Sequence, residues 1–213
     1  MITLIIFDLD GTLVNSSVDI TNSLNYAIEP YELEKMTVEK TVGLVGEGLT
    51  MLVEKMLGRE NAQIMPDVME RFIRYYSEHL TEFTVPYPGV PETLEKLADY
   101  RKAVVSNKRE ALSKRLLESL KLSHYFDVIL GSDSAGEKKP SPKPILQILE
   151  MMKVKPDEAV IVGDSNYDIE AGKGAGIKTI AVTYGYRGVE FLGGADGMID
   201  HFPELPSRLE GLA

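Results

Sequence analysis

The chain has 213 residues, no cysteine and a formal net charge of −10 at pH 7. The lack of cysteine excludes disulfide bonds and thiol chemistry, and the acidic balance argues against nucleic acid or an anionic membrane as a partner. With 44% hydrophobic residues the chain can bury a sizeable core, while no apolar run approaches the roughly 20 residues of a membrane span. We expect a cytoplasmic protein without a signal peptide, as a monomer or homodimer, built as one domain or as a core with a small insertion.

Two acids follow the first apolar run of the chain. Residues 4–7 are apolar and partly β-branched, as is typical of a strand buried on both faces, and Asp8 and Asp10 come at its end, where Gly11-Thr12 turns the chain. Carboxylates this close resist ionising together, and a divalent cation would relieve that cost. One carboxylate would then attack a substrate while the other transfers protons. For an isolated Asp-x-Asp, an acidic turn with solvated side chains is the alternative.

A long helical block follows this turn. The apolar spacing predicts helices over residues 17–28, 37–41 and 49–57, and one long or two shorter helices around Pro66 over 61–79. A glycine-rich loop is expected over 43–48, and no strand. We interpret residues 15–84 as an insertion between the first strand and the rest of the fold. The catalytic core is then expected to consist of residues 1–14 and 85–213.

Strands and helices alternate in the remainder of the chain. Apolar runs predict strands over residues 103–105, 127–130, 159–162, 178–182 and 197–199, with helices between them over 110–120, 145–152 and 168–175, and an earlier helix that ends at residue 100. Such alternation is typical of a parallel sheet with helices on both faces. The predicted fold class is α/β, with a three-layer parallel-sheet core and a helical insertion.

Polar residues collect where these strands end. Beyond the two acids near the N-terminus, they are Ser106, Asn107, Lys139, Asp164 and Asp168. The carboxyl ends of parallel strands lie along one edge of a sheet, so these separate pieces of sequence are expected to converge. Each piece alone is common in turns and loops, but four pieces together are hard to obtain by accident.

Four stretches resemble the sequence motifs of the haloacid dehalogenase (HAD) superfamily. In chain order they are Phe7–Leu13, Val105–Lys108, Lys139–Pro142 and Val162–Asp168. The resemblance covers nearly the whole chain, including the return to the core at Pro88-Gly89-Val90. It implies a HAD-like, Rossmann-like core, a helical cap of the C1 type over residues 15–84, and an enzyme that uses Mg²⁺.

The resemblance, together with the needs of phosphoryl transfer, implies a role for each polar residue. Asp8 is the expected nucleophile, which forms an aspartyl-phosphate, and Asp10 is the expected acid and base for the leaving group and the attacking water. Mg²⁺ is expected on the Asp8 carboxylate, the Asp10 backbone carbonyl and Asp164. Lys139, the lysine directly before proline, is expected to neutralise the nucleophile and the phosphoryl charge.

Other residues are expected to bind the substrate or to support the site. The expected phosphate-binding residues are Gly11, Thr12, Ser106 and Asn107. Asp168 is expected to orient Lys139 or a metal-bound water rather than to ligate the metal. Dehalogenases of this superfamily lack a carboxylate two residues after the nucleophile, because a halide leaving group needs no proton. Asp10 therefore favours phosphoryl transfer over carbon–halogen cleavage.

The helical block is expected to act as a lid. Linkers near residues 15–17 and 81–87 would let it open and close, which excludes water and admits a small substrate. Gly46, Glu47 and Gly48 lie in the loop with which family members contact the leaving group. The glycines permit close backbone approach, and the amides that start the next helix would bind an anion such as a carboxylate. An ordinary helix–helix connection is the alternative.

The expected partner is a small phosphorylated metabolite. Residues 42–49, 87–90 and 105–108 look most like those of phosphoglycolate phosphatases, which implies hydrolysis of 2-phosphoglycolate. Pyrophosphatases and sugar phosphatases share these motifs and stay open as alternatives, as does a phosphomutase of the β-phosphoglucomutase type. The cap loop has no arginine or lysine to hold a second phosphate, which favours hydrolysis over a mutase reaction. The intact acids and lysine argue against a non-catalytic binding protein.

Overall fold

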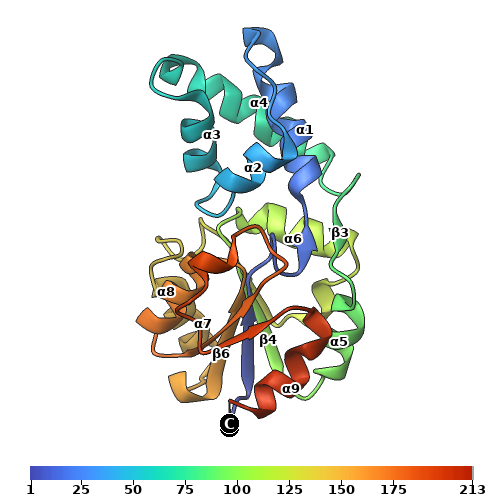
Figure 1. Ribbon diagram of the computed structural model, residues 1–213, viewed down its shortest axis with the longest axis vertical. Helices are drawn as coiled ribbons and strands as arrows, with labels where there is room; N and C mark the ends of the chain where they lie inside the picture. The colour runs from blue at the N-terminus through green and yellow to red at the C-terminus, as the bar shows by residue number, and fades with distance from the viewer. Residues whose placement is uncertain (213) are drawn as a thin grey trace.

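Six parallel strands form the central sheet of the computed structural model, which describes residues 1–212 (Figure 1). In spatial order the strands are β5 (Val128–Leu130), β4 (Arg101–Val105), β1 (Leu4–Phe7), β6 (Ala159–Gly163), β7 (Lys178–Val182) and β8 (Gly197–Ile199). Every neighbouring pair is parallel. The predicted parallel sheet is confirmed, and the carboxyl ends of its strands lie along one edge.

Helices cover both faces of this sheet, as the alternation predicted. On one face lie α5 (Val90–Lys96), α6 (Glu110–Ser119) and α9 (Leu205–Glu210), and on the other α7 (Lys143–Met152) and α8 (Asn166–Gly174). The side chains of successive β1 residues point to opposite faces of the sheet, because side chains alternate along a strand. Ile5 and Phe7 pack with the first group of helices, whereas Leu4 and Ile6 pack with the second. All four side chains are fully buried, so β1 is the centre of a three-layer core.

Four further helices stand above the carboxyl edge of the sheet (Figure 1). They are α1 (Ser17–Ile28), α2 (Val38–Leu44), α3 (Leu49–Leu57) and α4 (Met65–Glu78). Their apolar sides enclose a core of their own around residues such as Leu24, Val53 and Phe72, and Leu112 of α6 packs into the same cluster. The fold is therefore a Rossmann-like core with an inserted helical cap, as predicted, and the cap rests directly on the core.

The structure refines the bounds of two cap helices. Helix α2 runs through Gly43 to Leu44, since the Val45 N–H still donates to the Thr41 carbonyl (3.1 Å), so the connecting loop is shorter than predicted. Of the two alternatives for residues 61–79, the structure has two pieces that meet next to Pro66, a short 3-10 turn and then α4. Pro66 lies in the first turn of α4, where a missing N–H leaves no helical hydrogen bond unmade.

A short two-stranded ribbon joins the cap to the core. Strand β2 (Val14–Asn15) pairs antiparallel with β3 (Val85–Pro86), a feature that no sequence pattern indicated because two residues carry no periodicity. The buried Asp19 carboxylate ties α1 to the second linker. It accepts hydrogen bonds from the N–H groups of Phe83 (3.1 Å) and Thr84 (2.8 Å), and from the Thr84 hydroxyl (2.6 Å). The two linkers are thus bound to each other.

Short 3-10 turns and a cis peptide bond lie between the helices and strands. Single 3-10 turns occupy Glu29–Tyr31, Ala62–Ile64, Ser123–Tyr125, Pro156–Glu158, Val189–Phe191 and Phe202–Glu204. The Lys139-Pro140 peptide bond is cis. Among the helices that the structure describes, none is long and apolar enough to cross a bilayer.

Candidate active site

Asp8 is held at the carboxyl end of β1 by the sheet itself. Its N–H donates to the Val162 carbonyl of the neighbouring strand at 2.9 Å. The chain then turns sharply, because the Leu9 carbonyl accepts hydrogen bonds from three successive N–H groups three to five residues later. Gly11 has a φ of +87°, and a Cβ atom there would lie 2.3 Å from Asp164 Oδ2. The turn therefore needs glycine, both for its backbone conformation and to leave space for the second acid.

Lys139 reaches the same place from the loop before α7. Its ammonium lies 2.8 Å from Asp8 Oδ1 and 2.6 Å from Asp168 Oδ1, and it donates to the Val105 carbonyl at 2.7 Å. Its side chain is only 2% exposed. Burial lowers the pKa of Lys139, but the Asp168 and Asp8 carboxylates outweigh burial, and the net effect is a raised pKa. Lys139 is thus a fixed positive charge behind the nucleophile candidate.

Three carboxylates gather around this lysine. Oxygens of Asp8, Asp164 and Asp168 all lie within 4.8 Å of one another. Burial raises the pKa of Asp8 to about 7, against the opposing charge of Lys139. Burial also raises the pKa of Asp164 well above its ordinary range, and the charges of Asp8 and Asp168 add to the shift. One ammonium does not compensate three buried carboxylates, so the cluster has a deficit of positive charge.

The cluster fits a hard divalent cation. Asp8 Oδ1 is buried and, although it lies 2.8 Å from the Lys139 ammonium, it has no aligned hydrogen bond among residues 1–212. Carboxylate oxygens are the donors that such cations prefer. Asp168 is already committed, since one of its oxygens pairs with Lys139 and the other accepts from the Ser165 N–H (3.1 Å) and hydroxyl (2.6 Å). Asp8 and Asp164 are therefore the better placed ligands.

Ser106 and Asn107 lie at the end of β4, beside Asp8, and both line the cavity described below. The Asn107 side chain donates to the carbonyls of Lys139 (2.9 Å) and Gly46 (2.7 Å), and it accepts from the Lys139 N–H (2.9 Å). The Ser106 hydroxyl accepts from the Lys108 N–H (3.2 Å) and keeps its own proton for a ligand. Of the predicted pair, the serine can use its side chain for a phosphoryl oxygen, whereas Asn107 has only its backbone N–H to offer.

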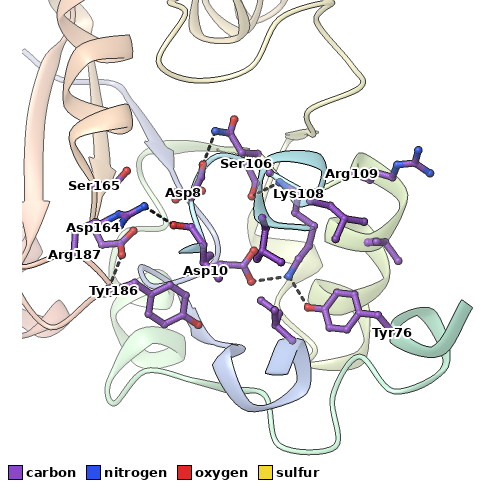
Figure 2. A pocket seen from close by; sticks show the side chains of 18 of the residues that line it. Asp8, Asp10, Tyr76, Ser106, Lys108, Arg109, Asp164, Ser165, Tyr186 and Arg187 are labelled. Carbon is purple, nitrogen blue, oxygen red and sulfur yellow. Dashed lines mark hydrogen bonds and ion pairs between the residues drawn. The ribbon is translucent and has the colours of Figure 1, made fainter. Parts of the chain in front are cut away.

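Asp10 has a different environment from the other acids. The Ser16 hydroxyl donates to its Oδ1 at 2.5 Å, and the Lys108 ammonium lies 2.6 Å from the same oxygen. The Lys108 ammonium also donates to the hydroxyl of Tyr76, a buried residue of the cap helix α4, at 2.7 Å (Figure 2). Burial raises the pKa of Tyr76 to about 12, so this tyrosine stays protonated at neutral pH. Asp10 is thereby connected to the cap.

A cavity of about 740 Å³, counted with its open mouth, separates the cap from these residues. Its core side carries Asp8, Asp10, Ser106, Asn107, Lys108 and Asp164. Its cap side is apolar and consists mainly of Ile20, Val45, Leu49, Leu52 and Phe72. A phosphate group would contact charged and polar side chains on the core side of the cavity. The rest of a small substrate would contact apolar side chains on the cap side.

The cap loop is fastened to the core by polar contacts. Arg187 donates to the carbonyls of Gly43 (2.9 Å) and Val45 (2.8 Å). The Glu47 carboxylate accepts from the Tyr167 hydroxyl (2.5 Å) and pairs with Lys55 (2.6 Å), while the Lys138 ammonium donates to the Glu47 carbonyl. Gly46 and Gly48 line the cavity with their backbone, whereas the Glu47 side chain is engaged with the core surface.

The structure thus brings the predicted residues together and adds four more. Asp8, Asp10, Ser106 and Asp164 share the cavity with the cap glycines, Lys139 and Asp168 lie directly behind Asp8, and the Thr12 hydroxyl faces Asp164 at 3.4 Å. The four residues that were not predicted as site residues are Tyr76, Lys108, Tyr186 and Arg187. The Tyr186 N–H donates to Asp164 Oδ2 at 2.6 Å, and its hydroxyl bonds Ser16.

The sequence indicated a place in the site for some of these four residues but not for all of them. Lys108 directly follows two predicted site residues, and Tyr186 and Arg187 follow the strand β7, so their positions after strand ends were informative. Tyr76 occurs in an ordinary apolar helix pattern, which is indistinguishable from core packing.

Comparison with known proteins gives a consistent result. The family model described as haloacid dehalogenase-like hydrolase matches residues 5–182. A phosphoglycolate phosphatase of Aquifex aeolicus is 45% identical over 184 residues, which is 85% of each chain, and one of Chromobacterium violaceum is 38% identical over 206 residues, 93% of this chain and 92% of the other. The crystal structure of a predicted phosphoglycolate phosphatase from Haemophilus somnus matches with a TM-score of 0.90 and 30% identity over 98% of both chains.

Proposed function

Because the chain belongs to the haloacid dehalogenase-like hydrolase family and is a phosphoric monoester hydrolase of that family, we propose that it hydrolyses 2-phosphoglycolate through an aspartyl-phosphate on Asp8. The names of its relatives support the substrate. One observation in the structure carries the mechanism. The Asp8 carboxylate lies at the polar end of a half-apolar cavity, with the buried Lys139 ammonium 2.8 Å away.

In this mechanism an oxygen of Asp8 attacks phosphorus, and the bond from phosphorus to the ester oxygen breaks. Lys139 opposes the charge of the nucleophile and of the phosphoryl oxygens, and Asp168 keeps the lysine in place through its contact at 2.6 Å. The Ser106 hydroxyl and the Asn107 backbone N–H are positioned to donate to phosphoryl oxygens. Gly11 and Thr12 complete the phosphate-binding turn.

Asp10 supplies the proton transfers of both half-reactions. As an acid it protonates the departing glycolate oxygen, and as a base it then takes a proton from the water that attacks the aspartyl-phosphate. The Ser16 hydroxyl and the Lys108 ammonium fix the orientation of its carboxylate. A carboxylate in this position would be superfluous for carbon–halogen cleavage, since halide leaves without a proton.

The acidic cluster is the place for Mg²⁺. Asp8 and Asp164 would hold the cation through carboxylate oxygens, and Asp10 through its backbone carbonyl. When bound, Mg²⁺ would neutralise charge on the phosphoryl group and on the acids that surround it. The Tyr186 N–H and the Thr12 hydroxyl orient the Asp164 carboxylate for this task.

We propose that residues 15–84 act as a lid on the site. The ribbon of β2 and β3, together with the hydrogen bonds of Asp19 to Thr84, would form the hinge of this lid. The contacts of Arg187 hold the cap loop against the core. The apolar cap wall would exclude water from the phosphorylated Asp8 on the leaving-group side.

A phosphomutase is the second candidate, because the same core would transfer the phosphoryl group to a second substrate. A mutase needs cations in the cap to hold a second phosphate, and the cap side of this cavity is formed mainly by apolar residues. Sugar phosphatases and pyrophosphatases are disfavoured for a related reason. Hydrocarbon offers no hydrogen bonds to sugar hydroxyls or to a second phosphate.

The test is a screen of small phosphate monoesters, sugar phosphates and pyrophosphate with Mg²⁺, on the wild type and Asp8→Asn. Phosphate release from 2-phosphoglycolate is expected to exceed that from all other compounds and to vanish in Asp8→Asn. Equal release from the sugar phosphates would contradict the assignment of the substrate. Isomerisation of a sugar phosphate without phosphate release would support the mutase instead.

A further inference from the structure

Lys108 is a buried cation to which the mechanism assigns only the orientation of Asp10. Its side chain is 8% exposed and lines the cavity. The Lys108 ammonium has two hydrogen-bond partners among residues 1–212, namely Asp10 Oδ1 at 2.6 Å and the Tyr76 hydroxyl at 2.7 Å (Figure 2). An ammonium carries three protons. One proton is therefore left for a ligand in the cavity.

The other cations near the cavity either have partners elsewhere or point away from the acids. Arg187 uses both terminal nitrogens on backbone carbonyls of the cap loop. Lys139 is paired with Asp8 and Asp168. Arg109 is exposed, and Figure 2 shows its guanidinium pointing away from the acids. Among the described residues around the cavity, Lys108 is thus the cation that remains for the part of the substrate beyond the phosphate.

The position of Lys108 fits a short anionic leaving group. Asp10 must contact the ester oxygen in order to protonate it, and the Lys108 ammonium is 2.6 Å from Asp10 Oδ1. In 2-phosphoglycolate one methylene separates the ester oxygen from the carboxylate, so the carboxylate has to lie close to Asp10. Once Asp10 has given its proton to the ester oxygen, its carboxylate and that of glycolate lie side by side in a buried site, where they repel each other unless a cation lies between them. Lys108 is placed to be that cation.

We propose that Lys108, held by the Tyr76 hydroxyl of the cap, binds the carboxylate of the leaving group and sets the preference of the enzyme for esters of small anionic alcohols. The inference rests on the proposed function and assigns the carboxylate to a core lysine in place of the amides of the cap loop. The apolar cap wall contributes a surrounding of low polarity, in which the attraction between the Lys108 ammonium and a carboxylate is stronger than in water. In such surroundings a charge-assisted hydrogen bond is strong.

The experiment compares 2-phosphoglycolate with ethyl phosphate, which has the same length but no carboxylate. Values of kcat/KM for the two esters are measured on the wild type, Lys108→Met, Lys108→Arg and the surface control Lys114→Met. Among residues 1–212, the Lys114 side chain pairs only with Glu110, one helical turn away. Any effect of Lys108 on Asp10 acts on both esters and cancels in the ratio of their kcat/KM values. The ratio is expected to fall by about 10- to 100-fold in Lys108→Met, the range for a hydrogen bond to a charged group. Lys108→Arg should restore part of the ratio, and Lys114→Met should leave it unchanged.

An unchanged ratio in Lys108→Met would overturn the proposal, because the lysine would then serve Asp10 alone. A second measurement covers the case in which Lys108→Met does not fold. On Asp8→Asn, which keeps Lys108, calorimetry should show 2-phosphoglycolate binding more tightly than ethyl phosphate by at least about tenfold. Equal binding would overturn the proposal as well. A wild type that hydrolyses neither ester would instead refute the proposed function, so the two failures are distinguishable.

Discussion

Asn107 holds the backbone of Lys139 with both ends of its side-chain amide. Nδ2 donates to the Lys139 carbonyl and Oδ1 accepts from the Lys139 N–H, each at 2.9 Å. The second proton of Nδ2 goes to the Gly46 carbonyl in the cap loop at 2.7 Å. One buried side chain therefore joins the loop after β4, the loop before α7 and the cap. Asn107 therefore fixes the backbone of Lys139, while Asp168 fixes its ammonium.

The first prediction concerns this contact. Asn107→Ala is expected to lower kcat by about 100-fold, because a displacement of about 1 Å at a reacting centre has that effect. The free energy of unfolding should fall by about 1–3 kcal/mol, since two buried backbone groups of Lys139 lose their partners. Steady-state kinetics and urea unfolding measure both quantities. Asn166→Ala is the matched control, because within the described part of the chain the Asn166 side chain bonds only Glu170 on the same helix. A wild-type kcat in Asn107→Ala would show that Lys139 is held by other contacts.

The second prediction separates positioning by Asp168 from metal ligation. Asp168→Asn is expected to reduce kcat by about 10- to 100-fold, the usual loss when the partner of a site residue is removed. The Mg²⁺ concentration for half-maximal activity should change little in Asp168→Asn and rise strongly in Asp164→Asn. The reason is that both Asp168 oxygens are held by Lys139 and Ser165, whereas Asp164 Oδ1 faces only a long contact to the Thr12 hydroxyl among residues 1–212. Asp157→Asn, at an exposed position, is the control. Equal shifts in Mg²⁺ dependence for both variants would make Asp168 a ligand.

The third prediction is a dependence of stability on pH that Mg²⁺ removes. Burial raises the pKa of Asp8 from 3.8 to about 7 and raises that of Asp164 in the same direction. At pH values between 3.8 and about 7, the folded protein binds more protons than the unfolded chain. The free energy of unfolding therefore falls as the pH rises through this range. In EDTA, the unfolding temperature should decrease from about pH 5.5 to about pH 7, above the range in which carboxyl groups with a lowered pKa, such as Glu110 and Asp196, titrate.

Saturating Mg²⁺ should flatten this profile, because the cation stabilises the ionised carboxylates. The variant Asp8→Asn, which lacks one of the titrating groups, should show a smaller decrease in EDTA than the wild type. An unfolding temperature in EDTA that rises with pH over the same range would contradict the charge deficit inferred for the cluster.

The fourth prediction tests the contact between the core and the cap loop. Arg187→Ala removes the hydrogen bonds to the Gly43 and Val45 carbonyls. KM for the substrate should rise by about 3- to 10-fold, which corresponds to the net value of one hydrogen bond. Protease cleavage in the loop after α2 should also become faster. Arg208→Ala, whose arginine contacts a carbonyl remote from the cap, serves as the control. Unchanged KM and cleavage would mean that the loop is held by Tyr167 and Lys138 instead.

Much of the fold could be predicted because its signals are local. The strand β7 and the helix α3 have the bounds that their apolar patterns predicted, and β1 is a continuous apolar run that could only be a buried strand. The ribbon of β2 and β3 gave no such signal, because it consists of two residues on each side. Helix α9 was also missed, since its six residues include a proline and only two buried apolar side chains.

The candidate site likewise contains residues that a local sequence pattern indicates and residues that only the packing reveals. That Asp8, Asp10, Lys139 and Asp164 lie close together could be predicted because each occurs at or after a strand end, where a parallel sheet brings distant segments together. The pairing of Asp10 with Lys108 and Tyr76 depends on how the cap lies on the core, and no periodicity encodes that arrangement. The side-chain role of Asn107 was hidden for a similar reason. An amide can donate and accept, and only the structure shows that it is used on the backbone of Lys139.

The most direct measurement of the central claim is to trap the phosphorylated enzyme. The protein is mixed with 2-phosphoglycolate and Mg²⁺, quenched in acid within one turnover, digested and analysed by mass spectrometry. We expect the mass of one phosphoryl group on the peptide that contains Asp8, with no such increase in Asp8→Asn. In Asp10→Asn the phosphoryl group should both form and disappear more slowly, because the proposed mechanism assigns the acid and the base to Asp10. Turnover that proceeds in Asp8→Asn, or a phosphoryl group found on another residue, would contradict the account.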